Sequence, residues 1–170
     1  MRSYKRVTQY MTRYSTLWAS LLLLLLSGCG ARPFVQNDAA TIILKTPKIR
    51  FADAGYVRSN EEKVALELFT AGHPVGKFEI ENMVCVEGEG CMRKSSFNEE
   101  YLNRHYPDTL MENVLRGRPI YEGQNLLQKP YGFEQHIMDE HVDIKYRVTE
   151  RQIYFKDRSN RVLIKIKKQQ

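Results

Sequence analysis

Three cysteines are the residues of this chain best suited to covalent chemistry, and they lie in two different settings. Cys29 directly follows a short apolar run, residues 17–26, and the small residues Ser27 and Gly28. A cysteine thiolate is a good nucleophile, so an exposed cysteine at such a boundary is suited to accept a covalent group. Cys85 and Cys91 instead flank the segment Glu-Gly-Glu-Gly.

The segment around Cys85 and Cys91 predicts that these two cysteines lie close together. The segment between Cys85 and Cys91 is rich in glycine and forms a turn between two short apolar runs, so a hairpin brings both thiols together. In an exported protein such an even pair favours a disulfide, with two free thiols as the alternative. Zinc is less favoured, because a Cys-x5-Cys spacing without a nearby histidine matches no common ligand set.

The four histidines do not complete a reactive group. His136 and His141 are five residues apart, a spacing that does not place both on one helix face, so we interpret them as solvated loop residues rather than a metal pair. His73 and His105 are isolated, and no Ser-His-Asp or Cys-His set can be assembled. We therefore expect no enzyme, no catalytic residue, no metal and no cofactor.

The apolar run near the N-terminus predicts a secretion signal. As a helix, residues 17–26 reach only ~15 Å, about half of the ~30 Å hydrocarbon layer of a bilayer. Four basic residues precede the run, and no acidic residue occurs before Asp38. A basic start, a short apolar middle and small residues at the end together predict a signal peptide at residues 1–28.

The end of this signal resembles the bacterial lipobox, in the segment Leu26-Ser27-Gly28-Cys29. The resemblance implies that Cys29 receives diacylglycerol and that the chain is cleaved before it. A further fatty acid such as palmitate is then expected on the new amino group. Two or three acyl chains anchor a protein stably to a membrane. Gly30 is not the aspartate of an inner-membrane retention signal, which by analogy favours the outer membrane. Residues 29–40 are then a lipidated tether, and residues 41–170 a single domain.

Net charge argues against a nucleic-acid partner. The formal charge of the whole chain is +6, but the predicted signal carries four basic and no acidic residues. The mature chain keeps 22 basic against 20 acidic residues, and it shows no basic stripe interleaved with aromatic residues. Lys165, Lys167 and Lys168 are interpreted as the solvated face of a strand.

Hydrophobic periodicity predicts an α+β domain that is mainly antiparallel β. Strand patterns occupy residues 41–51, 64–69, 77–80, 141–148, 153–156 and 161–167. Residues 71–76 are expected to form a loop, and 120–135 are not determined. Between the strands, helices are expected over roughly 97–105 and from Asp108 to a stop at Gly117. Such a sheet must bury one face, either by curling round the helices or by closing on itself.

Three stretches resemble the LolB family of outer-membrane lipoprotein receptors: "VALELFTAGHPVGKFEIE", "PDTLMENVLRGRPI" and "IYFKDRSNRVLIKIKK". The resemblance implies an unclosed antiparallel β-barrel wrapped round a helical insert, with a largely apolar cavity. It also implies a function: acyl chains of lipoproteins are taken from a periplasmic carrier and inserted into the outer membrane. The family's protruding membrane-insertion loop corresponds to Pro74, Val75 and Gly76.

The same resemblance indicates which residues are candidates for lining the cavity. They are apolar positions on the predicted strands and helix, each of which could equally pack in the core. The candidates are Leu66, Leu68, Phe78, Leu110, Met111, Val114, Leu115, Ile153, Phe155 and Ile164.

A second function remains open from the sequence. A lipid-anchored protein of this kind can be a structural or assembly component of an envelope complex, such as a lipopolysaccharide-translocon plug or a secretion component. An acyl-chain carrier requires an apolar pocket of several hundred Å³. An assembly protein instead requires a filled core and an apolar surface patch.

Overall fold

The structure, a computed structural model, describes residues 33–169. Phe34–Gln170 form one compact unit. The predicted signal peptide (1–28), Cys29 and the first residues of the predicted tether lie outside the described residues.

The described chain is a sheet with a short helical insert. The strands are β1 (Gln36–Lys45), β2 (Arg50–Ser59), β3 (Val64–Thr70), β4 (His73–Ile80), β5 (Val84–Val86), β6 (Gly90–Met92), β7 (Leu126–Lys129), β8 (Gly132–Met138), β9 (Asp143–Thr149), β10 (Gln152–Asp157) and β11 (Val162–Lys168). The insert between β6 and β7 contains α2 (Lys94–Tyr101), α3 (Leu110–Arg116) and the 3₁₀ turn η1 (Tyr121–Gly123).

All eleven strands belong to one antiparallel sheet, in the order β6-β5-β4-β3-β2-β1-β11-β10-β9-β8-β7. Neighbours are consecutive in the chain except at the centre, where β1 pairs with β11 and Ile42 lies opposite Ile166. The edge strands β6 and β7 do not pair with each other, so the sheet is unclosed. The predicted class, a mainly antiparallel α+β fold, is confirmed.

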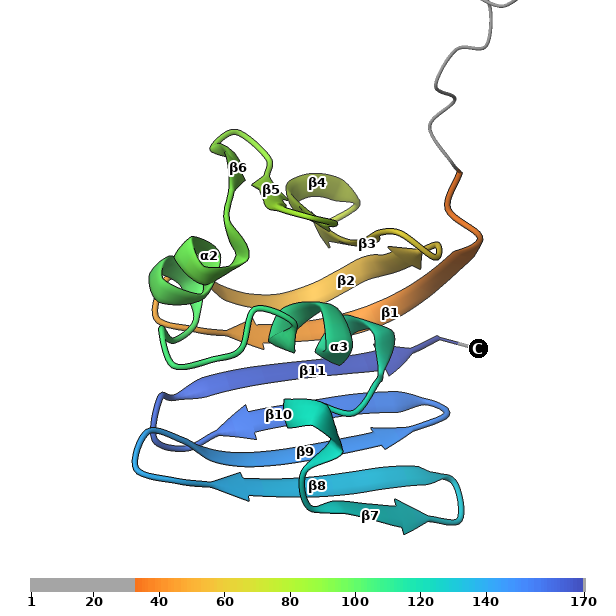
Figure 1. Ribbon diagram of the computed structural model, residues 1–170. Coiled ribbons are helices and arrows are strands. Elements are labelled where there is room, and N and C mark those ends of the chain that lie inside the picture. The colour runs from red at the N-terminus through yellow and green to blue at the C-terminus, as the bar shows by residue number, and fades with distance from the viewer. Residues whose placement is uncertain (1–32, 170) are drawn as a thin grey trace, which may run out of the picture. The chain divides into compact units, whose positions relative to one another are not determined.

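Both helices lie on the same side of the sheet, and the sheet curves towards them (Figure 1). α3 contacts both β3 and β10, although β2, β1 and β11 separate these two strands in the sheet. A flat sheet would hold β3 and β10 about 19 Å apart, because neighbouring strands lie about 4.8 Å from one another. The contacts of α3 therefore require curvature.

Alternation along the strands explains the core. On β1, Ala40, Ile42 and Leu44 are buried, whereas Thr41 between them is exposed and Ile43 is half-buried. α3 adds four buried residues: Leu110, Met111, Val114 and Leu115. Burial of each such Leu or Ile side chain contributes roughly 1.5–3 kcal/mol of hydrophobic free energy, so the helices and the inner face of the sheet stabilise each other.

The helix ends differ from the predicted ones. α2 begins at Lys94 rather than 97, and it ends at Tyr101 rather than 105. The spacing of Ser96 and Glu99 in the sequence predicts a capping box with Ser96 as N-cap, which is wrong, because Ser96 lies inside the helix, whose N-cap is Arg93. The buried side chain of Asn98, within α2, donates hydrogen bonds to the carbonyls of Tyr106 and Pro107, which follow the helix; each bond is 3.1 Å long. These bonds fold the chain back after α2. Gly117 ends α3 in the left-handed conformation, as expected.

Two boundaries need correction. The tether was expected to reach Ala40, but β1 begins at Gln36, because residues 36–40 pair with β2 in register. The loop expected at 71–76 is also wrong. Ala71 and Gly72 both have positive φ (52° and 83°), the geometry of a two-residue hairpin turn, so β4 starts already at His73. The undetermined stretch 120–135 contains η1, β7 and the first part of β8.

Candidate functional site

An open pocket lies at the end of the sheet where the β1–β2, β3–β4 and β5–β6 turns meet α2. We call it the hairpin pocket, and its volume is about 450 Å³. Its apolar lining comes from Ile49, Phe51, Leu68, Val75, Phe78 and Val86. Charged residues share the lining: Lys48, Arg50, Lys77, Glu87 and Glu89. Apolar side chains flanked by charged ones suit an amphiphilic ligand.

The β3–β4 hairpin positions Val75 at this pocket. Pro74, Val75 and Gly76 were predicted to form a loop, but all three lie in β4, next to the tight turn at Ala71 and Gly72. The pairing of β3 with β4 shifts register between Leu68 and Phe69. Val75 is 57% exposed, high for a valine within a strand. The hairpin therefore presents an apolar side chain beside the pocket rather than a flexible loop.

A polar cluster on α2 closes one side of the hairpin pocket. The Lys48 ammonium donates hydrogen bonds to Glu100, to Glu89 (3.3 Å) and to the Tyr101 hydroxyl (3.1 Å), and that hydroxyl donates to Glu89. The bond to Glu100 is the largest cause that raises the pKa of Lys48. The Tyr101 hydroxyl and then Lys48 lower the pKa of Glu89. The cluster thus ties α2 to both the β1–β2 and the β5–β6 turns.

Aromatic packing also holds α2 against β4. Phe97 and Tyr101 stack at a centroid distance of 4.7 Å, and Phe78 meets both rings edge-on at 6.0 and 6.2 Å. Such pairs add about 0.5–1.5 kcal/mol each beyond their buried area. Phe78 is therefore both a member of the core and part of the pocket lining.

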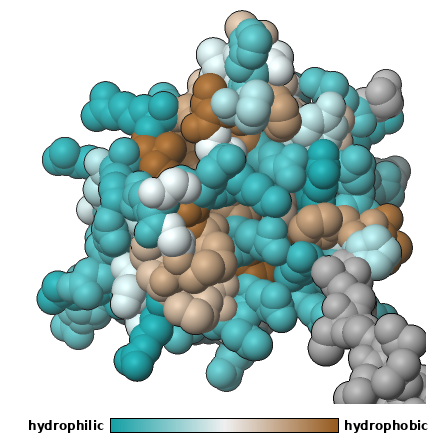
Figure 2. All heavy atoms as spheres, turned by 90° about the horizontal axis from the view of Figure 1, so that it is seen from above, coloured by the Kyte–Doolittle hydropathy of each residue, from teal (hydrophilic) through white to brown (hydrophobic). Residues whose placement is uncertain are grey.

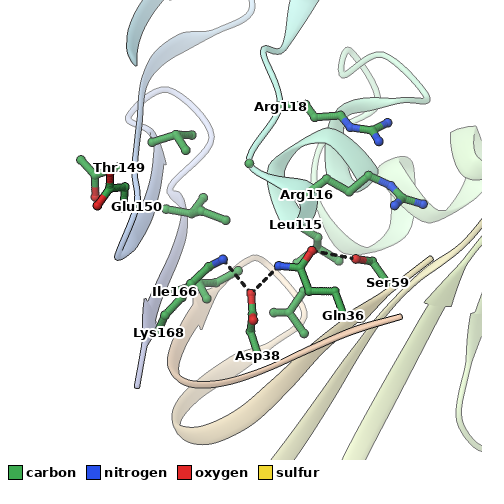
Figure 3. A pocket seen from close by; sticks show the side chains of 14 residues that line it. Gln36, Asp38, Ser59, Leu115, Arg116, Arg118, Thr149, Glu150, Ile166 and Lys168 are labelled. Carbon is green, nitrogen blue, oxygen red and sulfur yellow. Dashed lines mark hydrogen bonds and ion pairs between the residues drawn. The ribbon is translucent and has the colours of Figure 1, made fainter. Parts of the chain in front are cut away.

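A second pocket lies at the opposite end of the sheet, between the C-terminus of α3 and the strand ends (Figure 3). We call it the terminal pocket, and its volume is about 220 Å³. Its apolar lining comprises Val57, Leu115, Val148, Ile153 and Ile166.

A row of polar contacts crosses the terminal pocket (Figure 3). Asp38 receives one hydrogen bond from Gln36 at 2.7 Å and forms an ion pair with Lys168 at 2.6 Å. Burial alone would raise the pKa of Asp38, but the bonds from Lys168 and Gln36 outweigh it, and the pKa is lowered. Ser59 reaches Gln36 at 3.5 Å. This row joins β1 to β11, the first and last strands along the chain, which are neighbours at the centre of the sheet.

The structure divides the ten predicted cavity-lining residues into two groups. Leu68 and Phe78 line the hairpin pocket, and Leu115 and Ile153 line the terminal pocket. The other six line neither pocket and pack in the core, because the helical insert fills the space above the sheet. These six are Leu66, Leu110, Met111, Val114, Phe155 and Ile164.

Cys85 and Cys91 lie opposite each other on β5 and β6 and are joined by a disulfide. They therefore offer no free thiol. His105 and His141 stack at a centroid distance of 3.8 Å, and His136 lies 3.2 Å from Asp143. Within residues 33–169, no group of three or more His, Cys, Asp or Glu side chains is arranged to hold a metal ion.

The sequence reasoning missed the Lys48 cluster. Lys48 is separated from Glu89 by 41 residues and from Glu100 by 52, so no local pattern joins them. Of these residues, only Glu89 lies in a segment that the sequence analysis singled out, the turn between Cys85 and Cys91.

The upper surface, over β4–β6 and α2, is mostly hydrophilic, with apolar residues in small groups between charged ones (Figure 2). Within the described residues, no helix is both long and apolar enough to cross a membrane. Fold and site together define an antiparallel α+β domain with a partly apolar pocket at each end of a curved sheet. No protein-family model matches the chain, and no curated protein matches it.

Proposed function

We propose that this protein is a LolB-like, lipid-anchored receptor of the bacterial outer membrane. In this proposal Cys29 carries the anchor, and the domain binds acyl chains of lipoproteins and inserts them into the membrane. A periplasmic carrier is the expected donor. The observation that carries the proposal is the hairpin pocket with the exposed Val75 beside it.

The pocket suits the physical task. Each methylene buried away from water contributes about 0.8 kcal/mol, so a long acyl chain in water is unfavourable by more than about 10 kcal/mol. A carrier must therefore offer apolar surface until the bilayer takes over. The volume of about 450 Å³ lies within the range of roughly 300–1,000 Å³ for small-molecule pockets. No covalent step is needed, so the proposed function needs no catalytic residue.

Val75 is proposed as the tip that enters the bilayer. Burial of a whole valine side chain contributes roughly 1.5–3 kcal/mol, so insertion of the 57% that is exposed contributes about 1 kcal/mol. The short turn at Ala71 and Gly72 holds this tip rigidly, so little conformational entropy is lost when it inserts.

The test is a transfer assay. The soluble domain, residues 30–170, is loaded with a fluorescent acylated peptide and mixed with liposomes. We expect Val75→Glu to slow delivery at least about 10-fold while the domain stays folded, and Val75→Leu to preserve it. Leu127→Glu is the matched control, because Leu127 is 55% exposed but lies on β7, away from the pocket. Equal delivery by Val75→Glu and the control would contradict the role of Val75.

The alternative function, a structural or assembly lipoprotein, is favoured by the six predicted cavity residues that pack in the core. Around β7 and β8, Leu127, Tyr131 and Met138 are exposed and offer apolar surface to another protein. The same assay separates the two functions. If the wild-type domain binds no acylated peptide at micromolar concentration, the assembly role is the better explanation.

A further inference from the structure

The outer face of β9–β11 gathers basic side chains from distant parts of the chain. Buried and outward positions alternate on these strands, so Lys145 lies between the buried Ile144 and Tyr146 and points away from the core. We call the gathered residues the outer basic face: Lys145, Arg147, Lys156, Arg158 and Lys165. They line a shallow depression of about 300 Å³, together with Gln152 and Tyr154.

Sheet register places these charges side by side. Lys145 on β9 lies directly opposite Lys156 on β10, and Tyr154 lies between Arg147 and Lys165 on its two neighbouring strands. Two like charges directly opposite in a sheet are destabilising. No ion pair within residues 33–169 involves Lys145, Lys156 or Lys165. The arrangement is therefore unfavourable in isolation and becomes favourable when anions cover it.

Only two carboxylates lie near the face among the described residues. Glu134 pairs with Arg147 at 2.5 Å, and Asp143 lies 3.9 Å from Arg158. Both come from the side of β8 and β9, so neither neutralises the lysines of β10 and β11.

On the other half of the same outer surface, three basic residues pair with carboxylates. On β2–β4, Glu67 lies 3.2 Å from Arg58 and 3.8 Å from Lys77, and Glu79 pairs with Lys63 at 2.8 Å. Lys63 and then Lys77 lower the pKa of Glu79, as expected for a carboxylate held by cations. Arg58, Lys63 and Lys77 thus have carboxylate partners, whereas Lys145, Lys156 and Lys165 have no ion pair within residues 33–169.

We propose that the outer basic face docks the domain on the phosphate groups of an anionic phospholipid bilayer. This rests on the proposed anchoring at Cys29: when fully extended, the chain from Cys29 to Gln36 reaches at most about 25 Å. The domain then always lies near the membrane surface, where each lysine gains from anionic headgroups. A protein partner is less favoured, because none of the exposed large apolar residues lies on β9–β11.

The experiment is vesicle co-sedimentation of the soluble domain, residues 30–170. One set of vesicles is pure phosphatidylcholine, and the other contains 30% phosphatidylglycerol (about one lipid in three). We expect binding to the anionic vesicles alone, lost when salt is raised to about 0.5 M. The triple variant Lys145→Gln, Lys156→Gln, Lys165→Gln should bind roughly 100-fold more weakly.

A matched control removes the same charge elsewhere. Arg93→Gln, Arg118→Gln, Lys129→Gln alters three exposed basic residues outside β9–β11, and we expect it to change vesicle affinity less than about 3-fold. Equal losses in the two triple variants would show that only net charge matters and would overturn the proposal. So would unchanged binding by the first triple variant.

Further measurements distinguish bilayer docking from binding of other anions and from the proposed receptor function. Relief of binding by millimolar inorganic phosphate at constant ionic strength would indicate a free-anion site and overturn bilayer docking. Binding to polyglutamate or to a DNA duplex, without binding to anionic vesicles, would overturn it as well. Acylated-peptide binding in solution should be the same for wild type and the first triple variant. If the wild type binds anionic vesicles but no acylated peptide, the receptor function is contradicted and bilayer docking is not.

Discussion

Substitution of the buried Asp157 tests the network that joins the helical insert to the sheet. Asp157 is 1% exposed, and its carboxylate accepts four hydrogen bonds from the described residues. The Tyr106 hydroxyl and the Asn160 side chain donate at 2.7 Å, and the backbone amides of Asp143 and Asn160 donate at 3.2 and 3.3 Å. A carboxylate can accept all four bonds.

Asp157→Asn keeps the shape but turns one acceptor oxygen into a donor. About two of the four bonds are then lost, and a buried donor left unpaired costs about 1–3 kcal/mol. We expect the free energy of unfolding to fall by about 3 kcal/mol, which corresponds to a melting temperature lower by roughly 10 °C. Urea and thermal unfolding of the soluble domain, followed by circular dichroism, measure both quantities.

Two variants serve as comparisons. Tyr106→Phe removes one donor and leaves the carboxylate with three, so its effect should be smaller, about 1–2 kcal/mol. Asp53→Asn changes a carboxylate whose described bond is to the neighbouring amide of Ala54, and it should cost less than about 0.5 kcal/mol. If Asp157→Asn unfolds at the same urea concentration as Asp53→Asn, the network does not hold the insert in place.

Three further predictions follow from other contacts. Replacement of both Cys85 and Cys91 by alanine opens the short loop between them and should destabilise the domain by about 2 kcal/mol in denaturant titrations, as should reduction of the wild type. Gly132→Ala places a Cβ 1.9 Å from a backbone carbonyl of β9, so we expect loss of more than about 3 kcal/mol or failure to fold, seen as low soluble yield. Lys63 holds the pKa of Glu79 below its usual value, so the unfolded chain binds the proton more tightly. This contribution is complete above about pH 5 and is lost as pH falls through the lowered pKa, and Lys63→Gln should flatten stability against pH in that acidic range.

Local patterns were sufficient for much of the fold. Alternation in β3 and β11 identified both strands, and Gly117 identified the end of α3. No element could be predicted over residues 120–135, because β7 is exposed at every position and shows no alternation. The Ala71–Gly72 turn was mistaken for a longer loop, since Pro74 and Gly76 look like loop residues although they pair in β4.

The surfaces with a proposed role were harder to predict, because residues far apart in the sequence form them. Lys165 was correctly predicted to lie on a strand face, but nothing near it in the sequence indicates that Lys156 lies on the adjacent strand β10 and Lys145 on β9 beyond it. Likewise, the apolar periodicity of Leu110–Arg116 predicts a buried face and cannot distinguish a packed core from a cavity wall. How tightly the helical insert packs on the sheet determines whether these residues form a core or a cavity wall.

The pairing of β1 with β11 has a consequence for how the chain acquires its fold. Each half, β1–β6 and β7–β11, is a meander of neighbouring hairpins that need only short loop closures. The halves meet in a single ladder between the first and the last strand, so the slowest step is expected to be this distant closure. Until Val162–Lys168 pairs with β1, both meanders keep an open hydrogen-bonding edge, and a chaperone that shields those edges would raise the yield of folded protein.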